Sequence, residues 1–289
     1  AGSVREVVGR RDGEDVSIRA RIVVLSAGAY FSPVLLLNSA NAYWPEGLAN
    51  RSGQVGRNLM FHASDHIAVW PRGDRPAKGP RKTLAFRDFY LHEGKKLGAV
   101  QSTGRTVGYG YIVYFMKSQF DRSRWRWFKP LRPLLRIPAY LASYLFGRAT
   151  VFATIVEDSA YPENRVVPDP DEPSGMRFEY VVRAELRERV LAMRRLLKKV
   201  FARHRSLMLN HDVDLNYGHP CGTCRFGTDP ATSVLDENNK AHDLANLYVV
   251  DASFMPTSGG ANPGLTIAAN ALRVADRIST ALQQRGAAA

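Results

Sequence analysis

The sequence is poor in cysteine, in long apolar runs and in acidic side chains. Two cysteines among 289 residues exclude a small secreted domain held together by disulfides. No run of about 20 apolar residues occurs, so no segment is predicted to cross a bilayer as a helix. The chain also starts without methionine or a signal peptide, in the middle of an element. We therefore expect a missing N-terminal portion and a cytoplasmic or peripheral-membrane location, with a lost targeting signal left open.

Acidic residues are few relative to basic ones. The chain has 27 Asp and Glu against 40 Lys and Arg, which gives a formal net charge of +13. Such a charge attracts anionic partners, and nucleic acid, anionic lipid and an acidic companion chain all remain open. A merely basic solvated surface is the commonest explanation.

The two cysteines form a Cys-x-x-Cys pair, Cys221 and Cys224. A zinc site would need two further ligands, and only His219 and His211 lie nearby in the sequence. A redox pair would need a strand and helix around it that the sequence does not predict. We therefore predict two small packed residues in a tight loop, and no metal.

Both ends of the chain alternate strands and helices. Strands are expected at residues 4–8 and 16–25, joined at the Asp12-Gly13 turn, and the apolar run that ends at Leu25 is typical of a strand buried on both faces. Gly28 and a helix at residues 32–38 follow, with Pro33 in the first turn of the helix. A strand, a glycine turn and a helix in this order predict a corner of an α/β sheet that faces a phosphate or nucleotide.

The C-terminal part repeats this order. A buried strand is expected at residues 246–250, followed by Asp251, a glycine-rich loop at 257–264 and a helix at 265–282. The free backbone N–H groups at the start of that helix, with its dipole, favour negative charge nearby.

The middle of the chain has a different pattern. Short runs rich in β-branched and aromatic residues predict an antiparallel sheet, with strands at 67–70, 110–115, 151–156 and 176–182. Residues 184–204 predict an amphipathic helix with a solvated basic face. Its apolar face comprises Leu186, Val190, Met193, Leu197, Val200 and Phe201.

A basic and aromatic stretch covers residues 117–148. Its basic residues face one acid, Asp121, and are interleaved with Trp125, Trp127 and Phe128 before an apolar run at 137–146. The basic residues are Lys117, Arg122, Arg124, Arg126, Lys129, Arg132, Arg136 and Arg148. Packing against the protein itself or a partner subunit is the favoured interpretation, an anionic membrane surface is the second, and nucleic acid is unlikely.

Several segments resemble one flavoprotein family. Residues 218–227 (GHPCGTCRFG) resemble its His-Pro-x-Gly-Thr stretch, and residues 248–263 (YVVDASFMPTSGGANP) resemble its last signature. Residues 24–37 and 55–60 (VGRNLM) are similar to two earlier family motifs, and residues 158–168 also resemble it. Taken in order, these matches identify the chain as similar to the C-terminal portion of a glucose–methanol–choline (GMC) oxidoreductase.

The resemblance implies FAD as cofactor and the oxidation of an alcohol or sugar to a carbonyl. It assigns His219 as the base, or the group that stabilises the alkoxide, which suits a side chain with a pKa near neutral. Asn262 matches the family position held by His or Asn, and would donate to the substrate oxygen. The other six histidines, including His62 and His66, are predicted to be structural.

The resemblance also assigns the cofactor-binding residues. These are Gly28, Asp251, Ala252, Asn262, Pro263 and Gly264. The implied fold is α/β plus antiparallel β. Residues 1–58 and 216–289 would form part of a Rossmann-like FAD-binding domain, and residues 59–215 an inserted substrate-binding domain with helices flanking its sheet.

One family feature is absent from the sequence. The Gly-x-Gly-x-x-Gly dinucleotide fingerprint does not occur, so we expect an N-terminal segment or a companion chain to complete the FAD site. Two other functions stay open: a lyase on the same fold without net redox, and a non-catalytic subunit that docks on membranes. The sequence does not identify the substrate or the electron acceptor.

Overall fold

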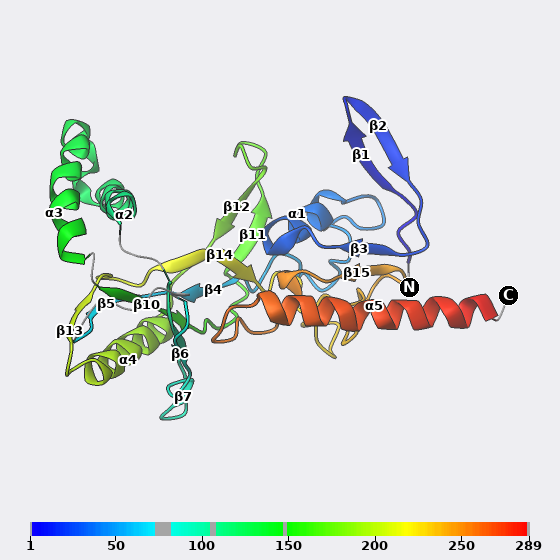
Figure 1. Cartoon of the computed structure of the whole chain (residues 1–289). Helices are drawn as coiled ribbons and strands as arrows, with labels where there is room; N and C mark the ends of the chain where they lie inside the picture. Colours follow the sequence, from blue (N-terminus) through cyan, green and yellow to red (C-terminus); the bar gives the residue numbers. More distant parts are fainter. Residues whose placement is uncertain (1, 73–81, 105–107, 147–148, 288–289) are drawn as a thin grey trace. The chain divides into compact units, whose positions relative to one another are not determined.

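The computed structural model describes residues 2–72, 82–104, 108–146 and 149–287. Of the residues named above, Arg148 lies outside these ranges. The chain divides into two compact units (Figure 1). Unit 1 comprises Ala1–His62, Glu157–Leu186 and Leu215–Ala289, and unit 2 comprises Ala63–Val156 and Arg187–Asp214. Residues 157–186 thus belong with the chain ends, whereas the sequence predicts that they lie in the inserted domain.

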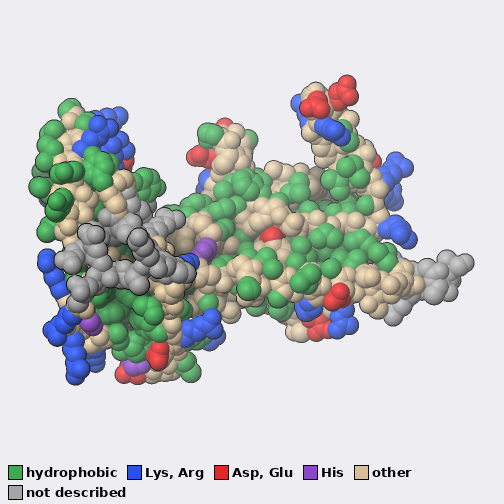
Figure 2. All heavy atoms as spheres, in the orientation of Figure 1, with side chains coloured by type: hydrophobic (Ala, Val, Ile, Leu, Met, Phe, Trp, Pro, Cys, Tyr) green, Lys and Arg blue, Asp and Glu red, His purple; other side chains and the backbone are tan. Residues whose placement is uncertain are grey.

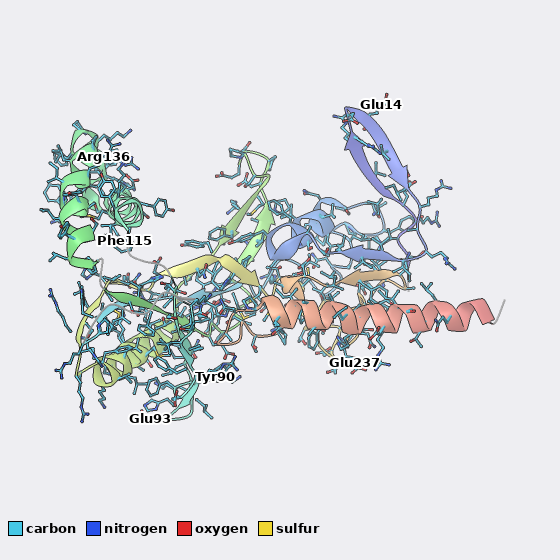
Figure 3. The ribbon with its side chains drawn as sticks, in the orientation of Figure 1. Glu14, Tyr90, Glu93, Phe115, Arg136 and Glu237 are labelled. Atoms are coloured by element: carbon cyan, nitrogen blue, oxygen red, sulfur yellow. The ribbon has the colours of Figure 1, made fainter. Side chains whose placement is uncertain are left out.

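Unit 1 begins with the expected hairpin. Strands β1 (Val7–Arg11) and β2 (Glu14–Ile18) pair in antiparallel register around the Asp12-Gly13 turn, and Glu14 lies at the tip of the hairpin (Figure 3). The strand expected at residues 16–25 is interrupted by the polar segment Arg19-Ala20-Arg21. Its second half is β3 (Val23–Leu25), which pairs in parallel with β15 (Leu247–Val249).

The apolar run that ends at Leu25 was expected to be buried on both faces, and this expectation is wrong for the described residues. Val24, at the centre of β3, is 46% exposed, because β3 and β15 form a two-stranded sheet. The residues of β15, in contrast, are buried. Leu247 and Val249 of β15 are part of the main hydrophobic cluster, which also includes Leu36, Met60 and Phe254.

Helix α1 (Gly28–Asn38) starts earlier than expected, so Pro33 lies inside it rather than in its first turn. A proline there cannot donate to the carbonyl four residues before it, which is that of Ala29. The hydroxyl of Thr223 donates to this carbonyl over 2.7 Å. The loop that follows His219 therefore supplies the hydrogen bond that the helix lacks.

The remaining elements of unit 1 are short strands and one long helix. Strand β4 (Met60–Ala63), which ends in unit 2, neighbours β14 (Leu215–Cys221), and β11 (Arg165–Pro168) pairs with β12 (Met176–Glu179). The 3-10 turn η3 (Ala252–Phe254) precedes helix α5 (Gly264–Ala287). Along α5, Val274 is buried, whereas Leu265 and Leu272 are exposed.

Unit 2 is built on an antiparallel sheet. Its strands follow the order β13-β5-β10-β9-β6. Their bounds are β5 His66–Trp70, β6 Ala85–Phe86, β9 Gly98–Ser102, β10 Thr150–Val156 and β13 Arg205–Met208. A small hairpin of β7 (Leu91–His92) and β8 (Lys95–Lys96) completes the strands described here.

Helices cover both faces of this sheet. Helix α4 (Ala184–Val200) carries the predicted apolar face, although Val200 itself is 46% exposed. Phe201, just after α4, packs against Phe152 of β10. Ala68 and Val151 point to the opposite face, where they meet Ile112 of α2 (Tyr109–Arg122) and Ala139 of α3 (Arg136–Phe146). Alternate residues of a strand point to opposite faces, so α4 and the α2–α3 pair lie on opposite sides (Figure 1).

The strand expected at residues 110–115 is wrong, because this segment lies in α2. Its aromatic and β-branched residues favour a strand locally. However, Ile112 and Met116 are four residues apart and both pack into the same cluster, which is the spacing of one helix face. Tertiary packing therefore decides the structure of this segment.

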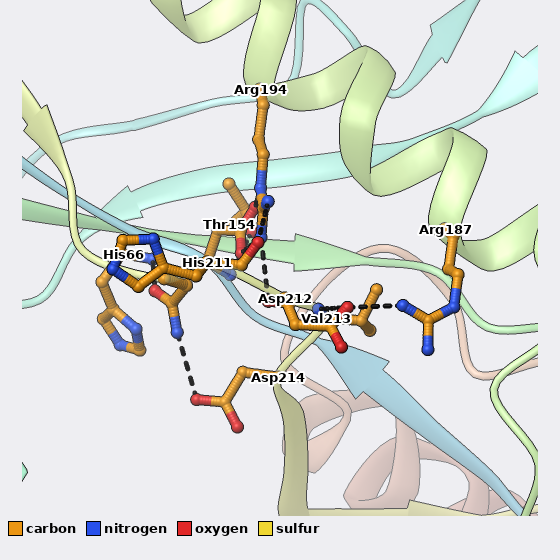
Figure 4. A network of polar contacts seen from close by, with 10 residues as sticks. His66, Thr154, Arg187, Arg194, His211, Asp212, Val213 and Asp214 are labelled. Atoms are coloured by element: carbon orange, nitrogen blue, oxygen red, sulfur yellow. Dashed lines mark hydrogen bonds and ion pairs between the residues drawn. The ribbon is translucent and has the colours of Figure 1, made fainter. Parts of the chain in front are cut away.

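A polar network ties α4 to the sheet of unit 2 (Figure 4). Arg194 binds both carboxylate oxygens of Asp65, over 2.6 and 2.8 Å, and also the carbonyl of His211. Arg187 bonds to Asp212. The basic face of α4 is therefore partly engaged in ion pairs rather than wholly solvated.

Candidate active site

Strand β14 carries His219 close to its C-terminal end, and the residues after it hold the strand in place. The backbone N–H groups of Gly222, Cys224 and Phe226 donate to the carbonyls of η3 over 2.8–3.2 Å. Gly222 has φ +92°, and a Cβ there would lie 2.5 Å from the carbonyl oxygen of Asn58. Only glycine allows β14 and the segment before β4 to approach this closely.

A second histidine contacts His219. The Nδ1 atom of His62, on β4, lies 3.1 Å from Nδ1 of His219, and the two rings meet edge to face. His62 is 0% exposed, whereas His219 is partly exposed. The sequence predicts a structural role for His62, and the only signal for more is its position two residues after the 55–60 motif.

The other nitrogen of His62 faces backbone carbonyls. Its Nε2 atom lies 3.0 Å from the carbonyl oxygen of Ser258 and 2.9 Å from that of Gly259. Burial is the main cause that lowers the pKa of His62 to about 4; the nearby His219 lowers it further, and the two carbonyls oppose the shift. His62 is therefore neutral at physiological pH.

A buried carboxylate organises the surroundings of His62. Asp158 accepts from the backbone N–H of Phe61 over 3.1 Å and from the hydroxyl of Tyr180 over 2.6 Å. Its own N–H donates to the hydroxyl of Ser258 over 2.8 Å. Asp158 thus fixes both the residue before His62 and the loop whose carbonyls meet its ring. Neither Asp158 nor Ser258 was predicted as a site residue, although both lie in the family-like segments.

An aromatic cluster lies beside β14. The ring of Phe61 contacts the rings of Tyr30, Phe178, Tyr180 and Tyr217, with centroids 5.1–6.3 Å apart. Burial, followed by the influence of Tyr217, raises the pKa of Tyr30 to about 12. The cluster keeps β4, β12 and β14 packed together and leaves Tyr217 half exposed two residues before His219.

Asp251 and Ala252 lie at the end of β15, at the same edge of the sheet as Gly28. The carboxylate of Asp251 accepts from the hydroxyls of Ser32 and Ser253, each over 2.5 Å, and from the N–H of Ser253. It therefore links α1 to η3. Because these oxygens are already engaged, Asp251 can serve a cofactor by shaping the backbone around it.

Asn262, Pro263 and Gly264 lie immediately before and at the start of α5. Asn262 is exposed, and no hydrogen bond joins it to His219 among the interactions of the described residues. The predicted catalytic pair is therefore not joined in this structure, whereas His219 and His62 are. Gly264, Leu265 and Thr266 leave the first turn of α5 open to a ligand.

The cysteines are the packed residues that the sequence predicts. Both are free and buried in the main cluster of unit 1. Burial raises the pKa of both thiols well above the usual range, with Asp158 and Asp251 adding to it at Cys221 and Cys224 respectively. The described residues contain no cluster of His, Cys, Asp and Glu suited to a metal ion.

Part of a flavin nucleotide site fits the residues present. Gly28 has φ +84° and nothing within 4 Å of where a Cβ would stand, so a ligand could approach the backbone at the start of α1. The parallel pair β3–β15 brings this corner and Asp251 to one edge. The first turn of α5 offers a second set of backbone N–H groups.

Known proteins resemble this chain in sequence. Residues 163–271 match the family model described as GMC oxidoreductase. The chain is 34% identical over 285 residues to 6'''-hydroxyparomomycin C oxidase of Streptomyces lividus, covering 94% of this chain and 47% of that protein. It is 31% identical over 283 residues to 2-methyl-1,2-propanediol dehydrogenase of Mycolicibacterium austroafricanum, covering 93% and 50%. The chain thus spans about half the length of the curated relatives that it matches.

Solved structures share the fold. A formate oxidase of Aspergillus oryzae superposes with a TM-score of 0.63 at 16% identity, covering 98% of this chain and 58% of that one. A pyridoxine 4-oxidase from Mesorbium loti gives 0.58 at 20% identity, covering 96% and 55%. The mixed α/β architecture with antiparallel sheets is therefore a fold that this chain shares with these two proteins.

Proposed function

We propose that this chain, a member of the GMC oxidoreductases, supplies the base that oxidises an alcohol or sugar to a carbonyl. FAD is the cofactor that the family indicates. The observation that carries the proposal is the position of His219: partly exposed on β14, and hydrogen-bonded to a buried, neutral His62.

Alcohol oxidation requires two bonds to break at the carbinol group. In the proposed reaction the hydroxyl proton goes to a ring nitrogen of His219, so that the oxygen electrons can form the C=O bond. Bound FAD would supply the acceptor for the hydride that leaves the adjacent carbon. The exposed amide of Asn262 would donate a hydrogen bond to the substrate oxygen.

Gly28, Asp251, Ala252, Asn262, Pro263 and Gly264 would hold the flavin nucleotide. Gly28 allows close approach at the start of α1, and Asp251 keeps the corner in shape through Ser32 and Ser253. The backbone N–H groups of the residues after Pro263, in the first turn of α5, would face the part of the flavin that becomes negative on reduction.

We further propose that an N-terminal segment or a companion chain completes a Rossmann-like FAD-binding domain. Exposed apolar side chains on β3, α1 and α5 support this: Val24, Phe31, Leu35, Leu265 and Leu272. Such residues gain free energy when a further layer of structure covers them. The sequence also lacks the dinucleotide fingerprint that this segment would supply.

The α2–α3 region of unit 2 is proposed as a contact surface for an anionic membrane. The 3-10 turns η1 (Arg124–Trp127) and η2 (Lys129–Leu135) expose Trp125, Trp127 and Phe128 beside basic residues. Figure 2 shows apolar side chains next to basic ones over these helices, and Arg136 lies at the start of α3 (Figure 3). Interfacial tryptophans with cations suit a lipid headgroup layer. None of the described helices is long and apolar enough to cross a bilayer.

Anaerobic stopped-flow spectroscopy of the FAD-loaded protein tests the proposed reaction. Primary alcohols, diols and amino sugars should be screened for bleaching of the flavin. With an active alcohol, His219→Asn should slow flavin reduction by about 100- to 10,000-fold, with unchanged flavin content. The exposed His204→Asn is the matched control and should reduce at the wild-type rate.

Two outcomes contradict the proposal. Flavin reduction in His219→Asn at the wild-type rate would remove His219 from the chemistry. Turnover of a hydroxyl compound with the flavin held oxidised would favour the lyase instead.

A further inference from the structure

The chemistry of His219 depends on which ring nitrogen carries its hydrogen. A neutral imidazole has one N–H and one lone pair, and only the lone pair can accept a proton. A base on β14 therefore needs its lone pair on the nitrogen that faces the substrate, and its N–H on the other.

The surroundings of His62 determine its own tautomer. The carbonyl oxygens of Ser258 and Gly259, at 3.0 and 2.9 Å from Nε2, can only accept hydrogen bonds. Nε2 of His62 therefore carries hydrogen. Because His62 is neutral, its Nδ1 has a lone pair, and this lone pair points to Nδ1 of His219 at 3.1 Å. Nδ1 of His219 must then donate.

Asn216 makes the opposite demand. Its Nδ2 lies 3.2 Å from the same Nδ1 of His219, and its Oδ1 accepts from the N–H of Gly218 over 3.1 Å, which fixes the direction of the amide. An amide N–H in this place favours a lone pair on Nδ1 of His219. His62 and Asn216 therefore make opposite demands on the tautomer of His219.

The cost of each arrangement decides between them. If Asn216 prevailed, the ring of His62 would turn its hydrogen to Nδ1, and the lone pair of Nε2 would face two carbonyl oxygens in a fully buried place. If His62 prevails, one amide N–H of Asn216, a partly exposed residue, loses a partner that water can replace. Unsatisfied buried groups cost far more than solvated ones, so His62 prevails.

We propose that His62 is a positioning residue, which holds His219 in the tautomer with hydrogen on Nδ1 and leaves Nε2 as the base. The role of Nε2 as the base rests on the proposed function, whereas the tautomer does not. The hydrogen bonds of Asp158 to Phe61 and Ser258 hold the His62 ring against the carbonyls of Ser258 and Gly259.

Nitrogen NMR reads the tautomer directly. In the full-length FAD-bound protein labelled with [¹⁵N]histidine, the resonances missing in His219→Asn identify His219. We expect Nδ1 of His219 to show the shift of a protonated nitrogen and Nε2 that of a bare one, at pH 7. The reverse pattern would overturn the proposal, whatever the enzyme oxidises.

Two amide variants separate the two contacts of His62. The oxygen of Asn can replace the Nδ1 acceptor, while the nitrogen of Gln can replace the Nε2 donor. We expect His62→Asn to keep the His219 tautomer and most of the rate of flavin reduction. His62→Gln should lose the tautomer and slow reduction by about 10- to 100-fold, with KM for the alcohol little changed.

A purely structural role gives the opposite ranking. If His62 only tethers the 258–259 loop, Gln should be tolerated and Asn should not, and the proposal fails. Asn216→Asp adds a rescue test, because a carboxylate accepts from Nδ1 of His219 where the amide donates. In the His62→Gln background it should restore the tautomer and most of the lost rate. If the tautomer is as proposed but His219→Asn reduces flavin normally, the proposed function fails while this assignment stands.

Discussion

At the scale of residues, the buried His62 links the candidate site to the stability of the fold. Its pKa is lowered to about 4 in the folded chain, against an ordinary value of about 6.5. Between these two pH values the unfolded chain binds more protons than the folded one. The contribution of neutral His62 to the free energy of unfolding is therefore present above about pH 6.5 and is lost as the pH falls toward about 4.

The expected result is a fall in the free energy of unfolding over this window. The share of His62 is about 3 kcal/mol, from about 2.5 pKa units. Urea unfolding at several pH values between about 4 and 7 measures it. His66, whose pKa burial also lowers, adds a fall of the same sign that persists in every His62 variant. In His62→Gln the free energy of unfolding should change less steeply with pH, by up to one proton. An unchanged slope would contradict the lowered pKa of His62.

The residues of the site were predictable where a sequence motif surrounds them. His219, Asp251 and Gly28 stand in recognisable segments, and the structure puts them at strand ends and at a helix start. Their roles stay predictions. His62 was missed because it is 157 residues from His219, and nothing local distinguishes a ring that another ring will contact.

At the scale of elements, long patterns were predicted better than short ones. The helix expected at residues 184–204 is α4 and the one expected at 265–282 is α5, because several apolar residues repeat at helical spacing. The strand expected at 110–115 failed because six residues do not distinguish a strand from part of a helix. The sequence predicts the strand β3 but not the strands beside it, because the strands that complete a sheet are distant in the sequence.

The α2–α3 region gives a prediction about lipid binding. Replacing Arg124, Arg126 and Lys129 by Gln removes three exposed charges, each worth about 1 kcal/mol near an anionic surface. The partition coefficient onto vesicles with phosphatidylserine should fall about a hundredfold. Sedimentation with sucrose-loaded vesicles measures this change.

A matched variant controls for net charge. Arg10, Arg11 and Arg19 lie in and just after the β1–β2 hairpin, with exposed side chains, and the same three changes there should leave the partition coefficient nearly unaltered. Equal losses in both variants would mean that net charge alone drives binding. Equal pelleting of the wild type on neutral vesicles would exclude the electrostatic surface.

At the scale of the whole molecule, the exposed apolar faces of unit 1 predict dependence on a further segment. The 289-residue chain alone should lose FAD during gel filtration, because the fingerprint that holds the adenosine part is absent from its sequence. A preparation that includes the complementary FAD-binding segment should elute with the flavin. Absorbance at the flavin band measures retention, and a stoichiometric yellow peak from the chain alone would contradict the prediction.

The burial of both cysteines has a practical consequence for spectroscopy. Their thiols stay protonated and enclosed in the core of unit 1, so maleimide reagents should not reach them while the fold is intact. A cysteine introduced at an exposed position of α3, such as Tyr144, would then be the single reactive thiol of this chain. The native sequence is therefore ready for attaching one fluorophore or spin label without first removing its own cysteines.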